Sequence, residues 1–115
     1  MPIYRALSLK QPWANLIRDG RKTIETRTWA TSYRGELLLC ASKMPRIEPF
    51  GCAMCLVELI DCRPMRRKDW RAACIKPYEP AFGWHLTNIR PVPPVPVRGS
   101  LQIFSVELPD LLPLK

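Results

Sequence analysis

Three charged side chains, Lys22, Glu25 and Arg27, stand close together early in this sequence. On a strand, Glu25 and Arg27 share one face because side chains alternate with a period of two residues. Lys22 has the opposite parity, so it joins them only if the Gly20-Arg21 turn or a bulge re-aims it. A carboxylate between two cations can hydrogen-bond the edge of a base or move a proton, while the cations hold a phosphate or a carbonyl oxygen. The alternative is a solvent-exposed, salt-bridged strand face.

The segment 10–13, Lys-Gln-Pro-Trp, stands where a first strand is expected to give way to a helix. Unpaired backbone N–H groups at such a junction favour anions, and Lys10 adds a positive charge. The amide of Gln11 can read the edge of a base, and the indole of Trp13 can stack on one. For Trp13 taken alone, anchoring of an amphipathic helix in the core is the preferred interpretation.

If Lys22, Glu25 and Arg27 lie in a cleft, two further places would offer polar or aromatic groups to it. Ser42 and Lys43 follow an apolar run that is typical of a buried strand, so Lys43 would emerge at the strand end and close the cleft. Ser42 would be a nucleophile only beside a base, and the sequence shows no triad. Trp84 follows Gly83 and would be a second stacking surface. The alternatives are an ordinary loop start and a core tryptophan beside the lone histidine, His85.

The five cysteines do not make a complete metal site or a disulfide framework. Cys52 and Cys55 have the spacing of half a zinc site, but no second pair of ligands accompanies them. On a strand they would also point to opposite faces, so we interpret them as small buried side chains and expect no metal and no cofactor. An odd number of cysteines without a secretory signal indicates reduced thiols and a cytoplasmic protein.

The charge of the chain favours a polyanionic partner. The net charge is +8 and the isoelectric point is near 9.7, which favours RNA or DNA, or a nucleotide-like ligand. A basic run contributes much of this excess and is interpreted as an RNA-facing patch or as a solubilising surface; it comprises Arg63, Arg66, Arg67, Lys68 and Arg71. No stretch approaches the roughly 20 apolar residues of a membrane helix, so we expect no membrane partner, and a monomer.

The elements that must position these groups are short. At 115 residues the chain is expected to be a single domain, 1–115, and its 13 prolines favour short strands and loops over long helices. Strands are expected over 3–9, 22–29, 36–41, 52–62, 82–89 and 101–108, and helices from 12 and over 66–75, the second ended by Pro77. The strand 52–62 is apolar on both faces and therefore central, and Ile24 marks the core side of its strand. This pattern predicts an α+β fold built on a small barrel of five or six short strands with two or three flanking helices.

Two segments of the chain resemble the signature of ASCH domains, which belong to the PUA-like superfamily. They are Ser-Leu-Lys-Gln-Pro-Trp-Ala at 8–14 and Gly-Arg-Lys-Thr-Ile-Glu-Thr-Arg at 20–27. The segment 103–109, Ile-Phe-Ser-Val-Glu-Leu-Pro, is similar to the last strand of such domains. The resemblance implies a PUA-like barrel with a cleft near the first helix and RNA or modified nucleosides as ligands. By position, Lys22, Glu25 and Arg27 would line this cleft, with Lys10 and Gln11 nearby.

The resemblance leaves the activity open between two functions. The first is a binding module for RNA or a modified nucleotide. The second is a small hydrolase of acetylated cytidine or of RNA phosphodiesters, because some relatives are acetylcytidine amidohydrolases and some are reported as ribonucleases. Those amidohydrolases carry Gly-x-Lys-Thr-x-Thr with the second threonine as proposed nucleophile, and here Glu25 takes that position. A hydrolase would therefore use Lys22 and Glu25 as an acid–base pair. A third, weaker interpretation is a protein-interaction domain that uses the Pro-Val stretch 91–96.

Overall fold

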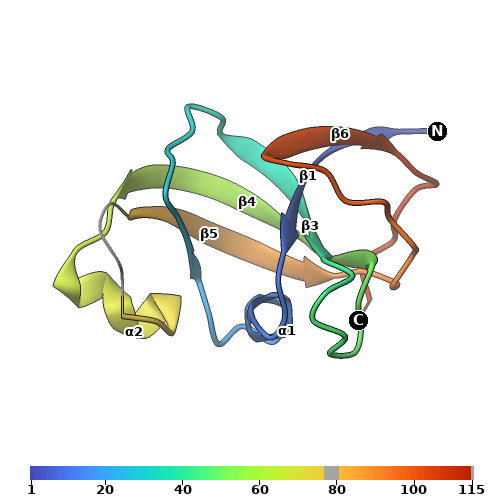
Figure 1. Ribbon diagram of the computed structural model, residues 1–115. Coiled ribbons are helices and arrows are strands. Elements are labelled where there is room, and N and C mark those ends of the chain that lie inside the picture. Colours follow the sequence, from blue (N-terminus) through green and yellow to red (C-terminus); the bar gives the residue numbers. More distant parts are fainter. Residues whose placement is uncertain (77–80, 115) are drawn as a thin grey trace.

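A computed structural model describes residues 1–76 and 81–114 of the chain (Figure 1). In chain order the elements are β1 (Ile3–Leu9), α1 (Trp13–Arg18), β2 (Ile24–Arg27), β3 (Gly35–Ala41), β4 (Cys52–Pro64), the 3₁₀ helix η1 (Arg67–Asp69), α2 (Trp70–Ala73), β5 (Phe82–Pro91) and β6 (Ile103–Glu107). The predicted strands are present, although β2 is only four residues long. The predicted helix end at Pro77 lies outside the described residues.

In the described residues, six strands form one mixed sheet in the order β2-β5-β4-β3-β1-β6. β1 and β3 are parallel, and the other neighbours are antiparallel. β4 lies between β5 and β3, and its residues enter clusters of buried side chains on both faces of the sheet. This confirms the prediction that the strand with two apolar faces is central.

The predicted barrel is not confirmed, because the sheet is open between its edge strands β2 and β6. β6 pairs with β1 only as far as Leu7, so the last residues of β1 extend beyond it. There, the Arg27 guanidinium on β2 donates a 2.6 Å hydrogen bond to the carbonyl oxygen of Ser8. A side chain thus spans the gap that paired strands would close in a barrel.

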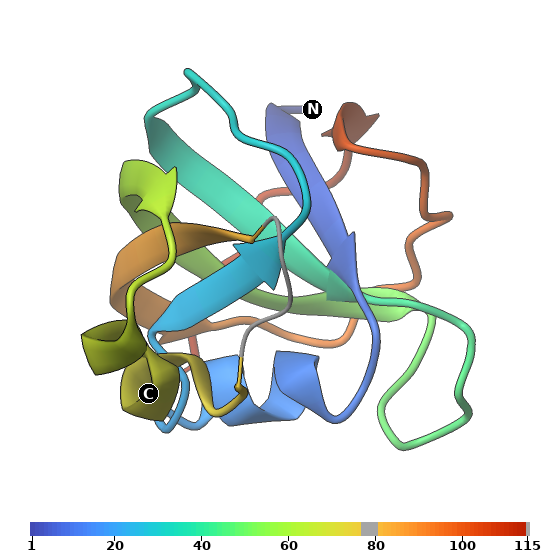
Figure 2. The same cartoon turned by 60° about the vertical axis from the view of Figure 1, so that its left-hand side comes forward.

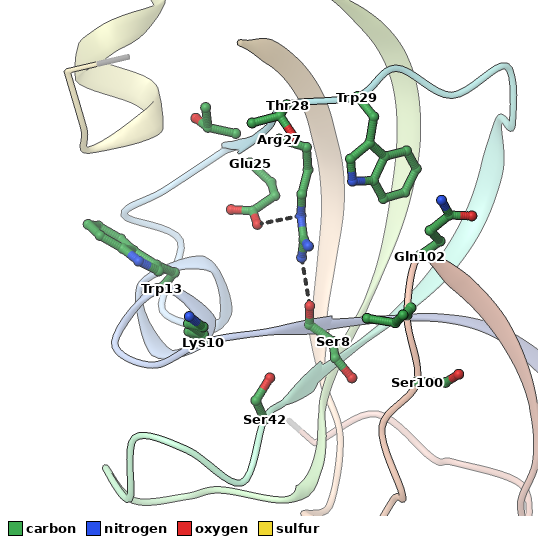
Figure 3. Close-up of a pocket in the computed structure, with 12 residues that line it drawn as sticks. Ser8, Lys10, Trp13, Glu25, Arg27, Thr28, Trp29, Ser42, Ser100 and Gln102 are labelled. Carbon is green, nitrogen blue, oxygen red and sulfur yellow. Dashed lines mark hydrogen bonds and ion pairs between the residues drawn. The ribbon is translucent and has the colours of Figure 1, made fainter. Parts of the chain in front are cut away.

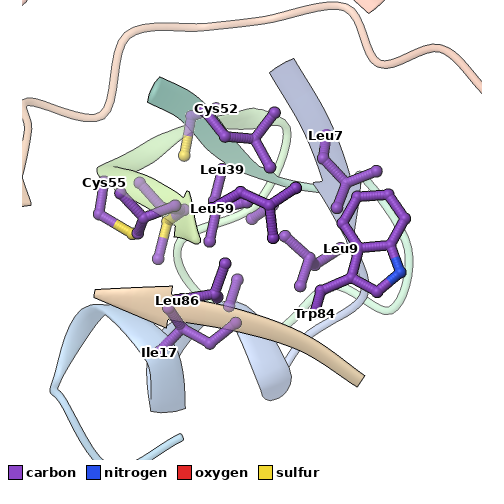
Figure 4. Close-up of a cluster of buried hydrophobic side chains, with 14 residues drawn as sticks. Leu7, Leu9, Ile17, Leu39, Cys52, Cys55, Leu59, Trp84 and Leu86 are labelled. Carbon is purple, nitrogen blue, oxygen red and sulfur yellow. The ribbon is translucent and has the colours of Figure 1, made fainter. Parts of the chain in front are cut away.

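Two hydrophobic clusters stabilise the sheet from opposite faces. The larger cluster, drawn in Figure 4, joins Leu7 and Leu9 of β1 to Trp84 and Leu86 of β5, and Ile17 of α1 covers it. The second cluster uses the alternate positions of the same strands, among them Ala6, Leu38, Cys40 and Leu56. This alternation follows from the two-residue period of a strand.

The helices lie on the same side of the sheet in both views (Figures 1 and 2). α1 follows Pro12 and ends before Gly20, whose φ of +81° is the left-handed conformation predicted for a helix end. The buried residues of α1 are Ala14 and Ile17. Trp13 is only half-buried, so the interpretation of Trp13 as the residue that anchors this helix in the core is not confirmed.

Candidate functional site

The open side of the sheet contains a cavity of about 460 Å³, which we call the cleft. It lies where the end of β1, the start of α1 and the strand β2 meet the segment that precedes β6 (Figure 3). Its lining residues are Ser8, Lys10, Trp13, Glu25, Thr26, Arg27, Thr28, Trp29, Ser42, Ser100, Leu101 and Gln102. Five of the predicted site residues are therefore brought together here, and they are Lys10, Trp13, Glu25, Arg27 and Ser42.

Glu25 and Arg27 form an ion pair on the wall of the cleft. Arg27 Nε lies 3.1 Å from Glu25 Oε2, and Glu25 is buried while the Arg27 side chain is 23% exposed. Register pairs Glu25 with Trp84 across β2 and β5, so Glu25 lies on the face of the sheet that carries the larger hydrophobic cluster. The prediction that Ile24 marks the core side of β2 was therefore incomplete, because both faces of β2 are covered. Ile24 is buried on the face opposite Glu25, and α2 packs against β2.

Lys22 reaches the same carboxylate from behind the cleft wall. The amides of Arg21 and Lys22 both donate to the carbonyl of Leu16, and this turn re-aims Lys22 as its parity required. Its Nζ lies 3.7 Å from Glu25 Oε1 and donates a hydrogen bond to the carbonyl of Ala73. The Lys22 side chain is only 2% exposed and does not line the cleft. It therefore acts on a ligand only through its neighbours.

Burial sets the protonation chemistry of this cluster. Burial raises the pKa of Glu25 above its ordinary value, and the nearby charges of Arg27 and Lys22 oppose that rise. Burial also lowers the pKa of Lys22, against the attraction of Glu25. A carboxyl whose pKa lies above its ordinary value, on the wall of a cavity, is suited to accept and return a proton.

Two indoles flank the ion pair, and a third proves to be core. In Figure 3, Glu25 and Arg27 lie between the rings of Trp13 and Trp29. The Trp13 ring has the Lys22 ammonium 5.1 Å from its centroid, which holds a cation behind the indole. Trp29 packs edge-on against Trp84, with centroids 4.8 Å apart. Trp84 itself is fully buried, so its predicted role as a stacking surface is wrong.

Gln11 is buried beside the cleft but does not line it. Its Oε1 accepts the backbone N–H of Asn15 at 2.9 Å, which satisfies a free donor in the first turn of α1. Its Nε2 donates to the carbonyl of Pro49 at 2.7 Å and to Asn15 Oδ1 at 3.1 Å. These bonds use its amide inside the protein, so Gln11 positions α1 and the loop between β3 and β4 instead of reading a base.

The far wall of the cleft was not predicted. Ser100, Leu101 and Gln102 line it, and they come from the segment before β6, more than 70 residues after β2. No local pattern marks these residues, apart from the glycine turn at 99 that brings the chain back. Lys43, predicted to close the cleft, is exposed and lines the neighbouring cavities instead.

The basic run and the cysteines lie elsewhere. Arg66, Arg67, Lys68 and Arg71 are exposed around η1 and α2, and none of them lines the cleft. Cys55 is in the core, where burial raises the pKa of its thiol to about 12. Within residues 1–76 and 81–114, no three Cys, His, Asp or Glu side chains gather as a metal site. No helix of that part of the chain is long and apolar enough to cross a membrane.

Comparison with known proteins supports what the cleft residues suggested. A family model described as the ASCH domain matches residues 7–96, which contain the end of β1, all of β2 to β5 and most of the residues that line the cleft. The chain belongs to the ASCH domain family. Its fold is similar to crystal structures of the ASCH protein from Zymomonas mobilis and of a point mutant of that protein. Each superposes with a TM-score of 0.65 and 18% identity, covering 80% of this chain and 72% and 74% of those chains.

Two curated relatives also match this ASCH domain. Both are named activating signal cointegrator 1, from Mus musculus and Homo sapiens, and each is 32% identical over 80 residues. The alignment covers 49% of this chain and 14% of each relative. The likeness therefore concerns one domain within much longer proteins.

Proposed function

We propose that this ASCH domain binds RNA or a modified nucleotide in the cleft, with one base between Trp13 and Trp29. The observation that carries the proposal is the placement of the Glu25–Arg27 pair between two half-buried indoles in a cavity of about 460 Å³. The carboxylate accepts hydrogen bonds from a base edge, and the guanidinium donates to a carbonyl or phosphate oxygen. The indoles supply stacking surfaces, which bind bases with little regard to sequence.

The charge of the cleft supports an anionic ligand. Lys10 is exposed at its rim and lies in no ion pair of the described residues, whereas Glu25, the single acid that lines it, is neutralised by two cations. The free positive charge thus faces solvent and the negative charge is buried. This arrangement attracts phosphate to the rim and leaves the neutral base for the interior.

The binding test uses one isosteric variant and one matched control. Glu25→Gln removes the charge and keeps the shape, and we expect it to lose most affinity for acetylcytidine and for a short single-stranded RNA in calorimetric titrations. Glu107→Gln makes the same change at an exposed residue of β6, outside the cleft, and should bind as the wild type does. Equal affinity for both variants, with folding confirmed by circular dichroism, would refute this assignment of the site.

A second candidate function, hydrolysis of acetylated cytidine, is favoured by the raised pKa of Glu25. Glu25 would take a proton from water as the water oxygen attacks the acetyl carbonyl carbon. It would then return that proton to the cytosine nitrogen as the C–N bond breaks, giving acetate and cytidine. Lys22 would be a positioning residue that keeps Glu25 ionised. Release of acetate that is lost in Glu25→Gln would establish this function, and binding without acetate release would leave the domain a binding module.

A further inference from the structure

The cleft does not end at Ser8 and Ser42. A second cavity of about 410 Å³ shares four lining residues with it, which are Ser8, Ser42, Ser100 and Leu101. A third cavity, also of about 410 Å³, shares Lys43, Val97 and Arg98 with the second. These two cavities, which we call the outer groove, continue the cleft past the ends of β1 and β3.

A ladder of backbone hydrogen bonds fixes the floor of the outer groove. The amide of Ser42 donates to the carbonyl of Leu9 at 2.8 Å, and the amide of Gly51 donates to the carbonyl of Ser42 at 3.3 Å. The amide of Val97 then donates to the carbonyl of Gly51 at 3.1 Å. Four segments that are distant in the sequence are thereby held side by side.

A cation directly follows three of the four residues that these hydrogen bonds join. Lys10 succeeds Leu9, Lys43 succeeds Ser42, and Arg98 succeeds Val97. The three cations are exposed, and no ion pair within the described residues includes any of them. Hydrogen-bonded neighbouring backbones lie about 4.8 Å apart, so the three steps from Leu9 to Val97 span roughly 14 Å.

Two glycines keep this row in place. Gly51 has φ of +65°, and a Cβ at this position would meet Lys43 Cγ at 3.3 Å, so the lysine stem packs against bare backbone. A Cβ at Gly99 would meet Ser8 Oγ at 2.7 Å, so the segment after Arg98 packs directly on β1. The backbone segments that carry these cations are therefore held by packing and hydrogen bonds and are not free loops.

We infer that Lys10, Lys43 and Arg98 form a phosphate-binding row for the backbone of a single-stranded RNA whose base occupies the cleft. The inference rests on the proposed function and deepens it, because it makes the ligand a strand and not a free nucleoside. Each strand of a helical nucleic acid carries one charge about every 3.4 Å along its axis, and even at roughly twice that spacing in an extended single strand a row of this length contacts two or more phosphodiesters. Stacking in the cleft and charge pairing in the groove would then bind different parts of one ligand.

The test compares a strand with a nucleoside. The double variant Lys43→Ala/Arg98→Ala removes two cations of the outer groove and no residue that lines the cleft. The matched control is Arg5→Ala, which removes an exposed arginine from the other end of β1, outside all three cavities. Each protein is titrated with acetylcytidine and with a fluorescein-labelled single-stranded RNA of about six nucleotides, at several salt concentrations.

We expect the double variant to bind the RNA at least tenfold more weakly at low salt. The slope of log affinity against log salt should become shallower by about 1.4, since each lost phosphate contact to a single strand contributes about 0.7. Acetylcytidine affinity should not change, and Arg5→Ala should match the wild type in both titrations.

Every other outcome overturns either the phosphate row or the proposed function. Unchanged RNA affinity and salt slope in the double variant would overturn the phosphate row and leave the proposed function standing. Loss of acetylcytidine binding in the same variant would show that the two residues support the shape of the cleft, which also overturns the row. Failure of the wild type to bind either probe would overturn the proposed function itself.

Discussion

The cleft and the basic patch of Arg66, Arg67, Lys68 and Arg71 both present cations to solvent, but they hold them differently. In the cleft, Arg27 pairs with a buried carboxylate and donates a hydrogen bond to the end of β1. In the patch, Arg67 lies over the Trp70 ring at 5.5 Å, and no patch residue lines the cleft or the outer groove.

The two regions therefore differ in what they can recognise: the patch offers charge alone, and the cleft offers a shaped cavity as well. A cluster of exposed cations attracts nucleic acid in a way that salt screens and that carries no chemical selectivity. A cavity with a carboxylate, a guanidinium and two indoles selects a base as well as a charge. The patch contains more cations than the cleft, yet we assign recognition to the cleft.

The largest difference between the two regions should appear in stability. Glu25→Ala leaves Lys22 and Arg27 without their carboxylate, and breaking a buried pair in this way typically costs about 3–5 kcal/mol. Arg71→Ala removes an exposed patch charge and should change the free energy of unfolding by less than about 0.5 kcal/mol. Urea denaturation of both variants measures this contrast. Similar stabilities would show that the buried pair is not the structural centre of the cleft.

Aromatic stacking should give the next largest effect, measured as a loss of binding free energy. Trp29→Leu removes one wall of the cleft, and loss of a stacked base typically costs about 1–3 kcal/mol of binding free energy. Trp70→Leu makes the same change beside the patch and should leave acetylcytidine affinity unaltered. Calorimetric titration distinguishes them, with thermal denaturation as the check on folding. Equal losses in both variants would contradict a cleft-specific base site.

The pH dependence of binding should report on Glu25. If the carboxylate accepts from the base, affinity rises with pH through the pKa of Glu25, which burial places above its ordinary value of 4.5. Lys22 lowers that pKa, so Lys22→Met should move the midpoint to higher pH, while Lys68→Met in the patch should not move it. Protein stability changes in the opposite direction: because the folded-state pKa of Glu25 is raised, stability falls as pH increases through this window. A midpoint that does not move in Lys22→Met would disprove the coupling.

The smallest effect belongs to the patch. Lys68→Ala should weaken RNA binding by no more than a few-fold at low salt, and the difference should vanish at high salt because exposed charges are screened within about 10 Å at 0.1 M. Acetylcytidine affinity should be the same as in the wild type. A loss that persists at high salt, or one that extends to the nucleoside, would place part of the recognition site in the patch.

Much of the site could be predicted from local patterns. The two-residue period of a strand placed Glu25 and Arg27 on one face, and the turn at Gly20 accounts for Lys22 joining them. The positions of the strands followed from apolar runs and turn residues.

The rest depended on tertiary structure. Ser100, Leu101 and Gln102 are ordinary loop residues that become a cleft wall only because β6 pairs with β1. The burial of Lys22 contradicts the usual exposure of lysine and needs both α2 and Glu25 to offset its charge. Closure of the sheet was predicted wrongly, because a side-chain hydrogen bond to Ser8 occupies the place of a strand pair.

Base recognition by the cleft is tested most directly with the four tryptophans, which report on the cleft, the patch and the core. Trp13 and Trp29 line the cleft, Trp70 lies at the patch, and Trp84 is buried. Indole N–H signals in ¹H–¹⁵N spectra, assigned through single Trp→Phe variants, are followed while a short single-stranded RNA is added. We expect large shifts for Trp13 and Trp29 and little change for Trp70. A large shift of Trp70 with Trp13 and Trp29 unmoved would contradict this expectation.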